Sequence, residues 1–264
     1  MRRRSFSKTH VLCGAVVFLI VVTLITACAW DVRPLGKAGG RISILVAFAL
    51  LLATAQAPDR LWLNGKEFFI HTNPLEPFLE VNPTARPKPE LISTCNWRGY
   101  IATWEVRDDH LILIDIDVLG LSREAAENES IGDVWKRRSV MSSVFPDRKE
   151  VLADWFSGHV IVPHGECIDY VHQGYASTYE NHIILRVDWG LVTRRWDLDL
   201  DGFLRFRDAQ FDQFKRTEEY RTKLSQLSDA PGKSEIVWNE DQKEQFLRQF
   251  YSERYMSLIF DALQ

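Results

Sequence analysis

Acidic residues are scarce at the N-terminus of this 264-residue chain and outnumber basic residues in the rest of it. Residues 1–57 hold seven of its 32 Lys and Arg residues but only one of its 36 Asp and Glu residues. The other residues therefore carry 25 basic and 35 acidic side chains, a net charge of −10. A nucleic-acid-binding protein needs a basic surface that neutralises phosphates, so this balance argues against binding to nucleic acid.

The chain also lacks an internal repeat and any strong catalytic signature. A serine lies near a histidine in Ser157-Gly158-His159, but without the strand–elbow–helix pattern of a nucleophile. Only two cysteines, Cys95 and Cys167, lie beyond residue 57, and neither is in a nucleophile signature. In an oxidising compartment they could form one disulfide, worth about 4 kcal/mol. The alternative is a pair of buried thiols that pack as small apolar groups.

What the chain does have is an apolar, basic-flanked N-terminus. Two apolar stretches, 11–29 and 42–57, each follow Lys or Arg residues. A basic segment followed by an apolar core is typical of membrane targeting. We therefore expect a membrane-targeting region over residues 1–57 and a single soluble domain over residues 58–264.

Three interpretations of this region remain open. The first stretch ends in a small-residue run before Cys28, which resembles a bacterial lipoprotein processing site and makes Cys28 a candidate for lipidation; a plain transmembrane helix is the alternative. The second stretch resembles a separate secretory signal with cleavage after Ala55, if the recorded start codon is too far upstream. In the third interpretation the two stretches form a membrane hairpin, which returns the domain to the cytoplasmic face. The hairpin leaves the basic loop 31–41 outside, against the positive-inside tendency, so an extracytoplasmic, periplasmic domain is favoured.

Strand patterns come first in the soluble part. Asn64-Gly65 between two apolar segments predicts a tight hairpin, because this pair accepts positive φ angles. Residues 73–89 contain five prolines and are expected to form an extended loop. The short connections predict antiparallel pairing. Strands are expected at 61–63, 66–70, 100–106, 111–118, 155–162, 167–171, 182–187 and 191–196, with turns at 163–166 and 188–190 and a short helix or loop at 122–128.

Helical spacing of apolar residues follows the strands. It extends over residues 203–227, breaks at Pro231-Gly232, and resumes after Asn239, which can form a capping box with Gln242. Strands followed by helices indicate an α+β fold. We therefore expect an antiparallel β-sheet of hairpins covered by two C-terminal helices.

Three stretches together resemble a group of uncharacterised bacterial proteins of similar size. They are residues 71–76 (HTNPLE), 97–104 (WRGYIATW) and 170–180 (YVHQGYASTYE). The resemblance covers most of residues 58–264. It implies a bacterial origin and a single domain, and it assigns no activity and no site residue.

The sharpest local pattern is the acidic segment DLDLDGFL at residues 197–204. Calcium loops place oxygen ligands at positions one, three, five and twelve, with glycine at six. The candidate Ca²⁺ ligands are Asp197, Asp199, Asp201 and Asp208, although Asp208 replaces the usual bidentate Glu. In the alternative interpretation Asp197 and Asp199 face water, and Asp201 caps the following helix.

Histidines with nearby acids supply the candidates for metal binding or acid–base chemistry. His159, His164, His172 and His182 lie within 24 residues, but no pair has the spacing of a zinc motif. Surface or hydrogen-bonded histidines are therefore favoured. For catalysis His172 is the first candidate, because it lies beside a predicted bend and near Glu180. The alternative is that His172 makes a hydrogen bond that fixes the loop.

The function that these patterns favour is binding. Trp97, Tyr100 and Trp104 could line a groove for a peptide or glycan, although such residues more often fill a core. We expect a membrane-tethered or secreted envelope protein that binds a protein partner. The alternative is a hydrolase-like envelope enzyme that uses His172 and nearby carboxylates, with or without a metal ion.

Overall fold

The structure, a computed structural model, describes residues 55–121, 135–172, 174–228 and 239–259. The chain divides into two units, residues 1–52 with 121–136 and residues 53–120 with 137–264. Almost all described residues belong to the second unit.

Several predicted features lie outside the described residues. These are the first apolar stretch with Cys28, most of the second apolar stretch, and the segment 122–128. Within the part of the chain that the structure describes, no helix is long and apolar enough to cross a bilayer.

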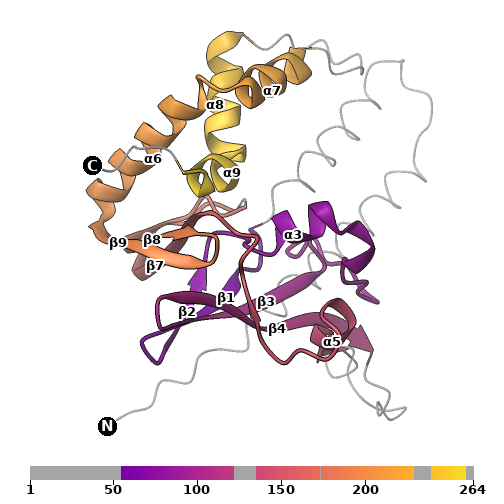
Figure 1. Cartoon of the computed structure of the whole chain (residues 1–264). Helices are drawn as coiled ribbons and strands as arrows, with labels where there is room; N and C mark the ends of the chain where they lie inside the picture. The colour runs from indigo at the N-terminus through magenta and orange to yellow at the C-terminus, as the bar shows by residue number, and fades with distance from the viewer. Residues whose placement is uncertain (1–54, 122–134, 173, 229–238, 260–264) are drawn as a thin grey trace, which may run out of the picture. The chain divides into compact units, whose positions relative to one another are not determined.

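The second unit has the predicted α+β fold (Figure 1). Six helices, nine strands and one 3₁₀ turn lie in the described residues. In chain order they are β1 (Asp59–Leu63), β2 (Lys66–Ile70), α3 (Glu76–Val81), η1 (Pro83–Ala85), β3 (Tyr100–Arg107), β4 (His110–Leu121), β5 (Trp135–Ser139), α5 (Met141–Val144), β6 (Val151–Leu152), β7 (Gly158–Asp169), β8 (Thr178–Asp188), β9 (Leu191–Asp199), α6 (Leu200–Phe214), α7 (Glu218–Ser228), α8 (Glu240–Phe250) and α9 (Ser252–Ser257).

The strands form one mixed sheet, in the order β2-β1-β3-β4-β9-β8-β7, with β5 and β6 paired to β4 beside this path. The predicted hairpins β1–β2 and β3–β4 are confirmed. The prediction of a purely antiparallel sheet is wrong, because β1 and β3 are parallel. Between β2 and β3 the chain makes a long crossover through α3 and η1, and only such a crossover brings a parallel strand alongside.

The two edge strands of this path also meet. The N–H of His71, just after β2, donates to the carbonyl of Ile161 on β7 at 2.8 Å. The hydroxyl of Thr72 donates to the carbonyl of His159 and accepts from the N–H of Ile161. The sheet therefore curls until its first and last strands lie side by side.

Two apolar clusters lie on opposite faces of β7 and β8. Side chains alternate between the faces of a strand, so Val160 and Val162 join the cluster inside the curled sheet, whereas Ile161 faces the C-terminal helices. These helices lie together on one side of β7, β8 and β9 (Figure 1). Fully burying each large apolar side chain contributes about 1.5–3 kcal/mol. The helix-facing cluster includes Ile184, Phe203, Phe206, Phe211, Phe214 and Tyr255.

Two strand predictions need correction. Residues 163–166 do not form a turn but continue the single long strand β7, and residues 155–157 precede it. Pro163 is tolerated because β7 ends the strand order, where a missing N–H donor is least costly. Gly165, with φ of +87°, accommodates the irregular register beside it.

The helix predictions were too coarse. Residues 73–89 contain α3 and η1, and the two expected C-terminal helices are four. Thr217 separates α6 from α7: its hydroxyl donates to the carbonyl of Phe214 and accepts from the N–H of Tyr220. The capping box of Asn239 and Gln242 at the start of α8 is as predicted.

Candidate functional site

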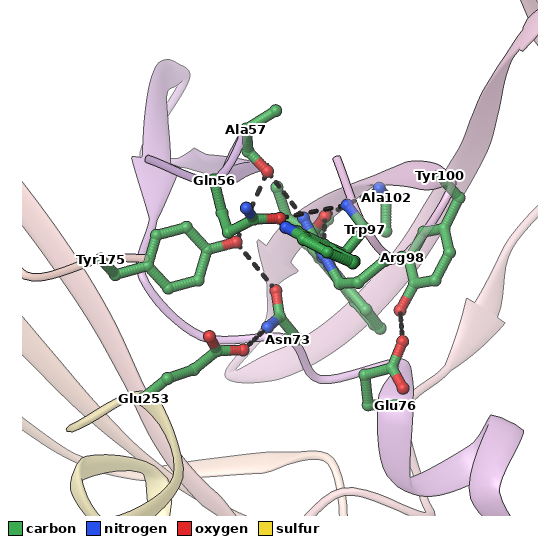
Figure 2. A network of polar contacts seen from close by, with 12 residues as sticks. Gln56, Ala57, Asn73, Glu76, Trp97, Arg98, Tyr100, Ala102, Tyr175 and Glu253 are labelled. Carbon is green, nitrogen blue, oxygen red and sulfur yellow. Dashed lines mark hydrogen bonds and ion pairs between the residues drawn. The ribbon is translucent and has the colours of Figure 1, made fainter. Parts of the chain in front are cut away.

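Three segments of the chain, residues 71–76, 97–104 and 170–180, converge at one end of the curled sheet. Asn73 follows β2, Arg98 precedes β3 and Tyr175 precedes β8, and all three enter one network of polar contacts (Figure 2). Asp59 on β1 and Glu253 on α9 join the same network. Residues far apart in the sequence thus form one buried cluster.

The centre of the network is an ion pair between Asp59 and Arg98. The Arg98 guanidinium lies 2.8 Å from the Asp59 carboxylate, and their side chains are 10% and 0% exposed. Asp59 also accepts from the N–H of Ala102 at 3.0 Å and from the indole N–H of Trp104 at 3.2 Å. Arg98 donates further to the carbonyl of Ala57 at 2.7 Å. A buried charge pair of this kind is tolerated only when its remaining donors and acceptors are also bonded.

A second carboxylate, Glu76 at the start of α3, is bonded in a similar way. Arg86 donates to both of its oxygens, at 3.0 and 2.8 Å, and the Tyr100 hydroxyl donates to one of them at 2.8 Å. Burial alone would raise the pKa of Glu76, but the hydrogen bonds from Arg86 and Tyr100 and the nearby positive charges bring it below its ordinary value. Glu76 is therefore a charged acceptor that joins α3 to β3.

The third carboxylate, Glu253, behaves differently. It accepts a hydrogen bond from the side-chain amide of Asn73, whose carbonyl oxygen accepts from the Tyr175 hydroxyl at 3.0 Å. Burial raises the pKa of Glu253 to about 7, against the opposing charge of Arg98. His71 stacks on Tyr175 with ring centres 4.9 Å apart, and burial lowers its pKa to about 3. Glu253 is thus the group in this network that titrates near neutral pH.

These contacts give the network a structural role. Its charged groups bond to other protein groups, and they join β1, the end of β2, β3 and α9. These bonds attach two helices to the sheet, because Glu76 of α3 bonds to Tyr100 of β3 and Glu253 of α9 bonds to Asn73 after β2. The network was not predicted from the sequence, although Asn73, Glu76, Arg98, Tyr100 and Tyr175 lie within residues 71–76, 97–104 and 170–180.

The network also includes the first described residues of the chain. The Ala57 N–H donates to the carbonyl of Cys95 at 2.6 Å, and the Ala57 carbonyl accepts from Arg98. Cleavage after Ala55 would preserve these bonds, whereas cleavage after Ala57 would remove them.

The predicted catalytic pair is not joined in the structure. The His172 ring nitrogen Nδ1 lies 2.8 Å from the Tyr170 hydroxyl, and both side chains are exposed. Glu180 is exposed on β8 beside Gly165. Among the described residues, no hydrogen bond or ion pair connects His172 to Glu180. Catalysis by His172 remains an untested prediction.

The candidate calcium ligands have separate protein partners. Asp197 pairs with Arg195 at 2.7 Å, and Asp208 pairs with Arg248 at 2.7 Å. The Asp199 carboxylate accepts from the N–H of Gly202 at 2.8 Å and so caps α6. The cap was predicted at Asp201, and this detail was wrong. Within the described residues no three His, Cys, Asp or Glu side chains are placed to hold a metal ion; Ca²⁺ binding stays a prediction.

Replacing Asp199 with alanine should lower the free energy of unfolding by about 1 kcal/mol, because it removes the N-cap of α6. Asp201→Ala is the matched control, since Asp201 is exposed in the first turn and should cost less. Thermal unfolding with and without millimolar Ca²⁺ compares the two roles. A rise in melting temperature with Ca²⁺ that both variants lose would support the calcium site. An effect of Asp201→Ala equal to that of Asp199→Ala would contradict the cap.

The cysteines and histidines occupy several different environments. Cys95 and Cys167 are exposed and are not bonded to each other in the structure; the alternative of two buried thiols was wrong, and the disulfide stays a prediction. His159 hydrogen-bonds to Gln210 at 3.0 Å, as expected for a structural histidine. His182 is fully buried and stacks on Phe203 with ring centres 3.6 Å apart.

The aromatic residues of the proposed groove separate into two groups. Tyr100 and Trp104 are fully buried, as the core interpretation required. Trp97 is 52% exposed. The three residues therefore do not line one groove.

A hollow of about 260 Å³ lies beside the network, on the outer face of β1, β2 and β3. Alternation along β1 points Leu61 and Leu63 inward and Arg60 and Trp62 outward. Phe69 on β2 is 55% exposed there. The hollow is lined by Ala57, Pro58, Arg60, Glu67, Phe69, Ile101 and Arg137.

Comparison with known proteins finds no match for this chain among family models, curated proteins or solved structures. The resemblance to uncharacterised bacterial proteins therefore stays a prediction.

Proposed function

We propose that this chain is a membrane-tethered domain of the bacterial envelope that acts by binding a protein partner. The observation that carries the proposal is the hollow on the outer face of β1, β2 and β3. It combines an exposed aromatic side chain, Phe69, with two arginines, Arg60 and Arg137. The N-terminal apolar stretches supply the tether.

The chemistry of the hollow suits an acidic segment of a partner protein. Binding surfaces are enriched in aromatic residues and arginine, and a few such residues supply most of the affinity. Arg60 lies 4.0 Å from Glu67, at the limit of an ion pair, and its charge also acts on the carboxylate of Asp117. A carboxylate of the partner could approach Arg60 and Arg137 while an apolar side chain contacts Phe69 and Ile101. Trp62, 39% exposed on the same face, extends this surface.

Replacing Phe69 with alanine and Arg137 with glutamate should weaken binding of the partner by about 2 kcal/mol or more, roughly 30-fold in Kd. The measurement is quantitative co-purification of the tagged full-length chain from detergent-solubilised membranes, followed by titration with the partner it identifies. Trp189→Ser is the matched control, because Trp189 is 74% exposed but lies in the turn between β8 and β9.

Two results would contradict the proposal. Equal loss of the partner with the Trp189 variant would show that the hollow is not the binding surface. Recovery of the wild-type chain outside the membrane fraction would show that the chain is not tethered to the membrane. A His172→Ala variant that loses a measurable hydrolytic activity at unchanged melting temperature would favour the enzyme alternative instead.

A further inference from the structure

We propose that two loops rest on a lipid bilayer, the one that precedes β3 and the one between β7 and β8, both of which contact residues 55–57. Leu91, Ile92 and Trp97 of the first loop would lie in the interfacial layer. This inference rests on the proposed function, because it requires that residues 42–54 remain attached and tether the chain. A tether by itself leaves the orientation of a domain undefined. Contact through these loops would give the domain one membrane-facing surface.

One loop is fixed against the point where the chain enters the domain. The N–H of Ala57 donates to the carbonyl of Cys95 at 2.6 Å. The side-chain amide of Gln56 donates to the carbonyl of Thr94 at 3.1 Å, and its oxygen accepts from the N–H of Trp97 at 3.1 Å. The loop that carries the apolar side chains is therefore held beside the first described residues.

A second loop is held on the other side of the same segment. The N–H of Gln56 donates to the carbonyl of Gly174 at 3.0 Å, and Ala55 forms a parallel bridge with Gly174. Tyr170, four residues earlier, is 64% exposed. Both loops that flank the entering chain thus present large exposed side chains.

The exposed side chains have the chemistry of an interfacial contact. Leu91 is 39% exposed, Ile92 is 64% exposed and Trp97 is 52% exposed, all within seven residues. Aliphatic side chains gain free energy when they leave water, and Trp and Tyr are enriched where the bilayer meets water. Leu52, the last residue of the aliphatic run, is three residues before Ala55, a reach of about 10 Å. A bilayer that holds this run therefore lies within reach of the loops.

Charge favours apolar insertion over electrostatic attraction. Beyond residue 57 the chain carries 25 basic and 35 acidic residues. Such a domain is repelled by anionic headgroups at long range. The contact should therefore persist in about 1 M salt, where the Debye length falls to about 3 Å.

Site-specific photocrosslinking of the full-length chain tests the inference. A benzophenone amino acid replaces Ile92, Trp97 or, as the matched control, Trp189, which follows the far end of β8 and is 74% exposed. Membranes are isolated, washed with carbonate or high salt, irradiated and digested, and adducts are identified by mass. We expect phospholipid adducts at positions 92 and 97 and none at position 189. The adducts at positions 92 and 97 should be equally abundant after the high-salt wash.

The controls separate failure of the inference from failure of the proposed function. If the chain stays in carbonate-washed membranes but positions 92 and 97 give no lipid adduct, the tether stands and the docking surface is wrong. Crosslinks to a protein at these positions in place of lipid would also overturn the inference. If the chain leaves the membranes in the carbonate wash, the proposed function fails and this inference fails with it.

Discussion

Replacing Arg98 with methionine should lower the free energy of unfolding by about 3–5 kcal/mol, because it leaves the Asp59 carboxylate buried without its counter-charge. The two groups lie 2.8 Å apart, and the Asp59 side chain is fully buried. Methionine keeps most of the length of arginine but neither its charge nor its donors. Urea unfolding of the full-length chain in detergent, followed by tryptophan fluorescence, measures the loss.

The hydrogen bonds around Asp59 explain why its carboxylate stays buried when Arg98 is replaced. Asp59 is held by the N–H of Ala102 and the indole N–H of Trp104, both buried on β3. Burial alone would lower the pKa of Arg98, but the charge of Asp59 raises it above its ordinary value. The arginine is therefore charged in the folded protein, and its removal changes the charge of the buried cluster by one unit.

Arg107→Met is the matched control for this prediction. Arg107 pairs with Glu105 and Glu150, but its side chain is 43% exposed. Surface pairs contribute about 0–1 kcal/mol, so this variant should be nearly as stable as the wild type. Adding Asp59→Asn to Arg98→Met should cost less than the sum of the two single changes, because the double variant buries no unpaired charge. Equal losses in the Arg98 and Arg107 variants would contradict the role of the buried pair.

Replacing Glu253 with glutamine should raise the free energy of unfolding at pH 8 by roughly 3 kcal/mol. This is the free energy that corresponds to the rise in the pKa of Glu253. Burial raises this pKa from 4.5 to about 7. A folded state that holds the proton more tightly gains stability below the unfolded pKa and loses it as the pH rises through the folded pKa. Glutamine resembles the protonated carboxyl group and can still accept from Asn73, so the variant should keep its stability up to pH 8.

The measurement is the free energy of unfolding of both chains at pH 5 and at pH 8. The difference between them should be small at pH 5 and large at pH 8. Burial lowers the pKa of His71 to about 3 and that of His182 to about 4, so both histidines destabilise the fold as the pH falls below 6.5. They are unchanged in the variant and cancel in the difference. Glu218→Gln, at a side chain 78% exposed, is the control.

A variant that is less stable than the wild type at both pH values would contradict this prediction. It would show that Glu253 is charged at both pH values and serves as a second counter-charge for Arg98.

The Arg98 and Glu253 variants also bear on the proposed membrane-facing surface. Arg98 bonds to the carbonyl of Ala57, so loss of the network should loosen the segment that holds both loops.

The sequence was sufficient where structure depends on neighbours along the chain. Asn64 and Gly65 adopt φ angles of 52° and 75°, which is what a tight hairpin turn requires of these residue types. The capping box of Asn239 and Gln242 forms within one helical turn. The pattern of strands followed by helices was enough to predict the α+β class.

Longer-range features could not be predicted in this way. The parallel pairing of β1 with β3 depends on where a crossover returns, and residues 71–99 carry no local signal for it. The break at Thr217 lacks Gly or Pro, so a single helix was expected there. The candidate calcium ligands show the same limit, because the partners of Asp197 and Asp208 are arginines that spacing alone does not bring together with them.

The polar network was decided by tertiary structure alone. Asn73 and Glu253 are separated by 180 positions in the chain, and Asp59 and Arg98 by 39. Each residue by itself has the ordinary character of a polar loop or helix residue. The curled sheet buries these residues together and removes the water around them. An unpaired charge then becomes costly, and the pKa of Glu253 rises to about 7. Both effects depend on groups that lie far apart in the sequence.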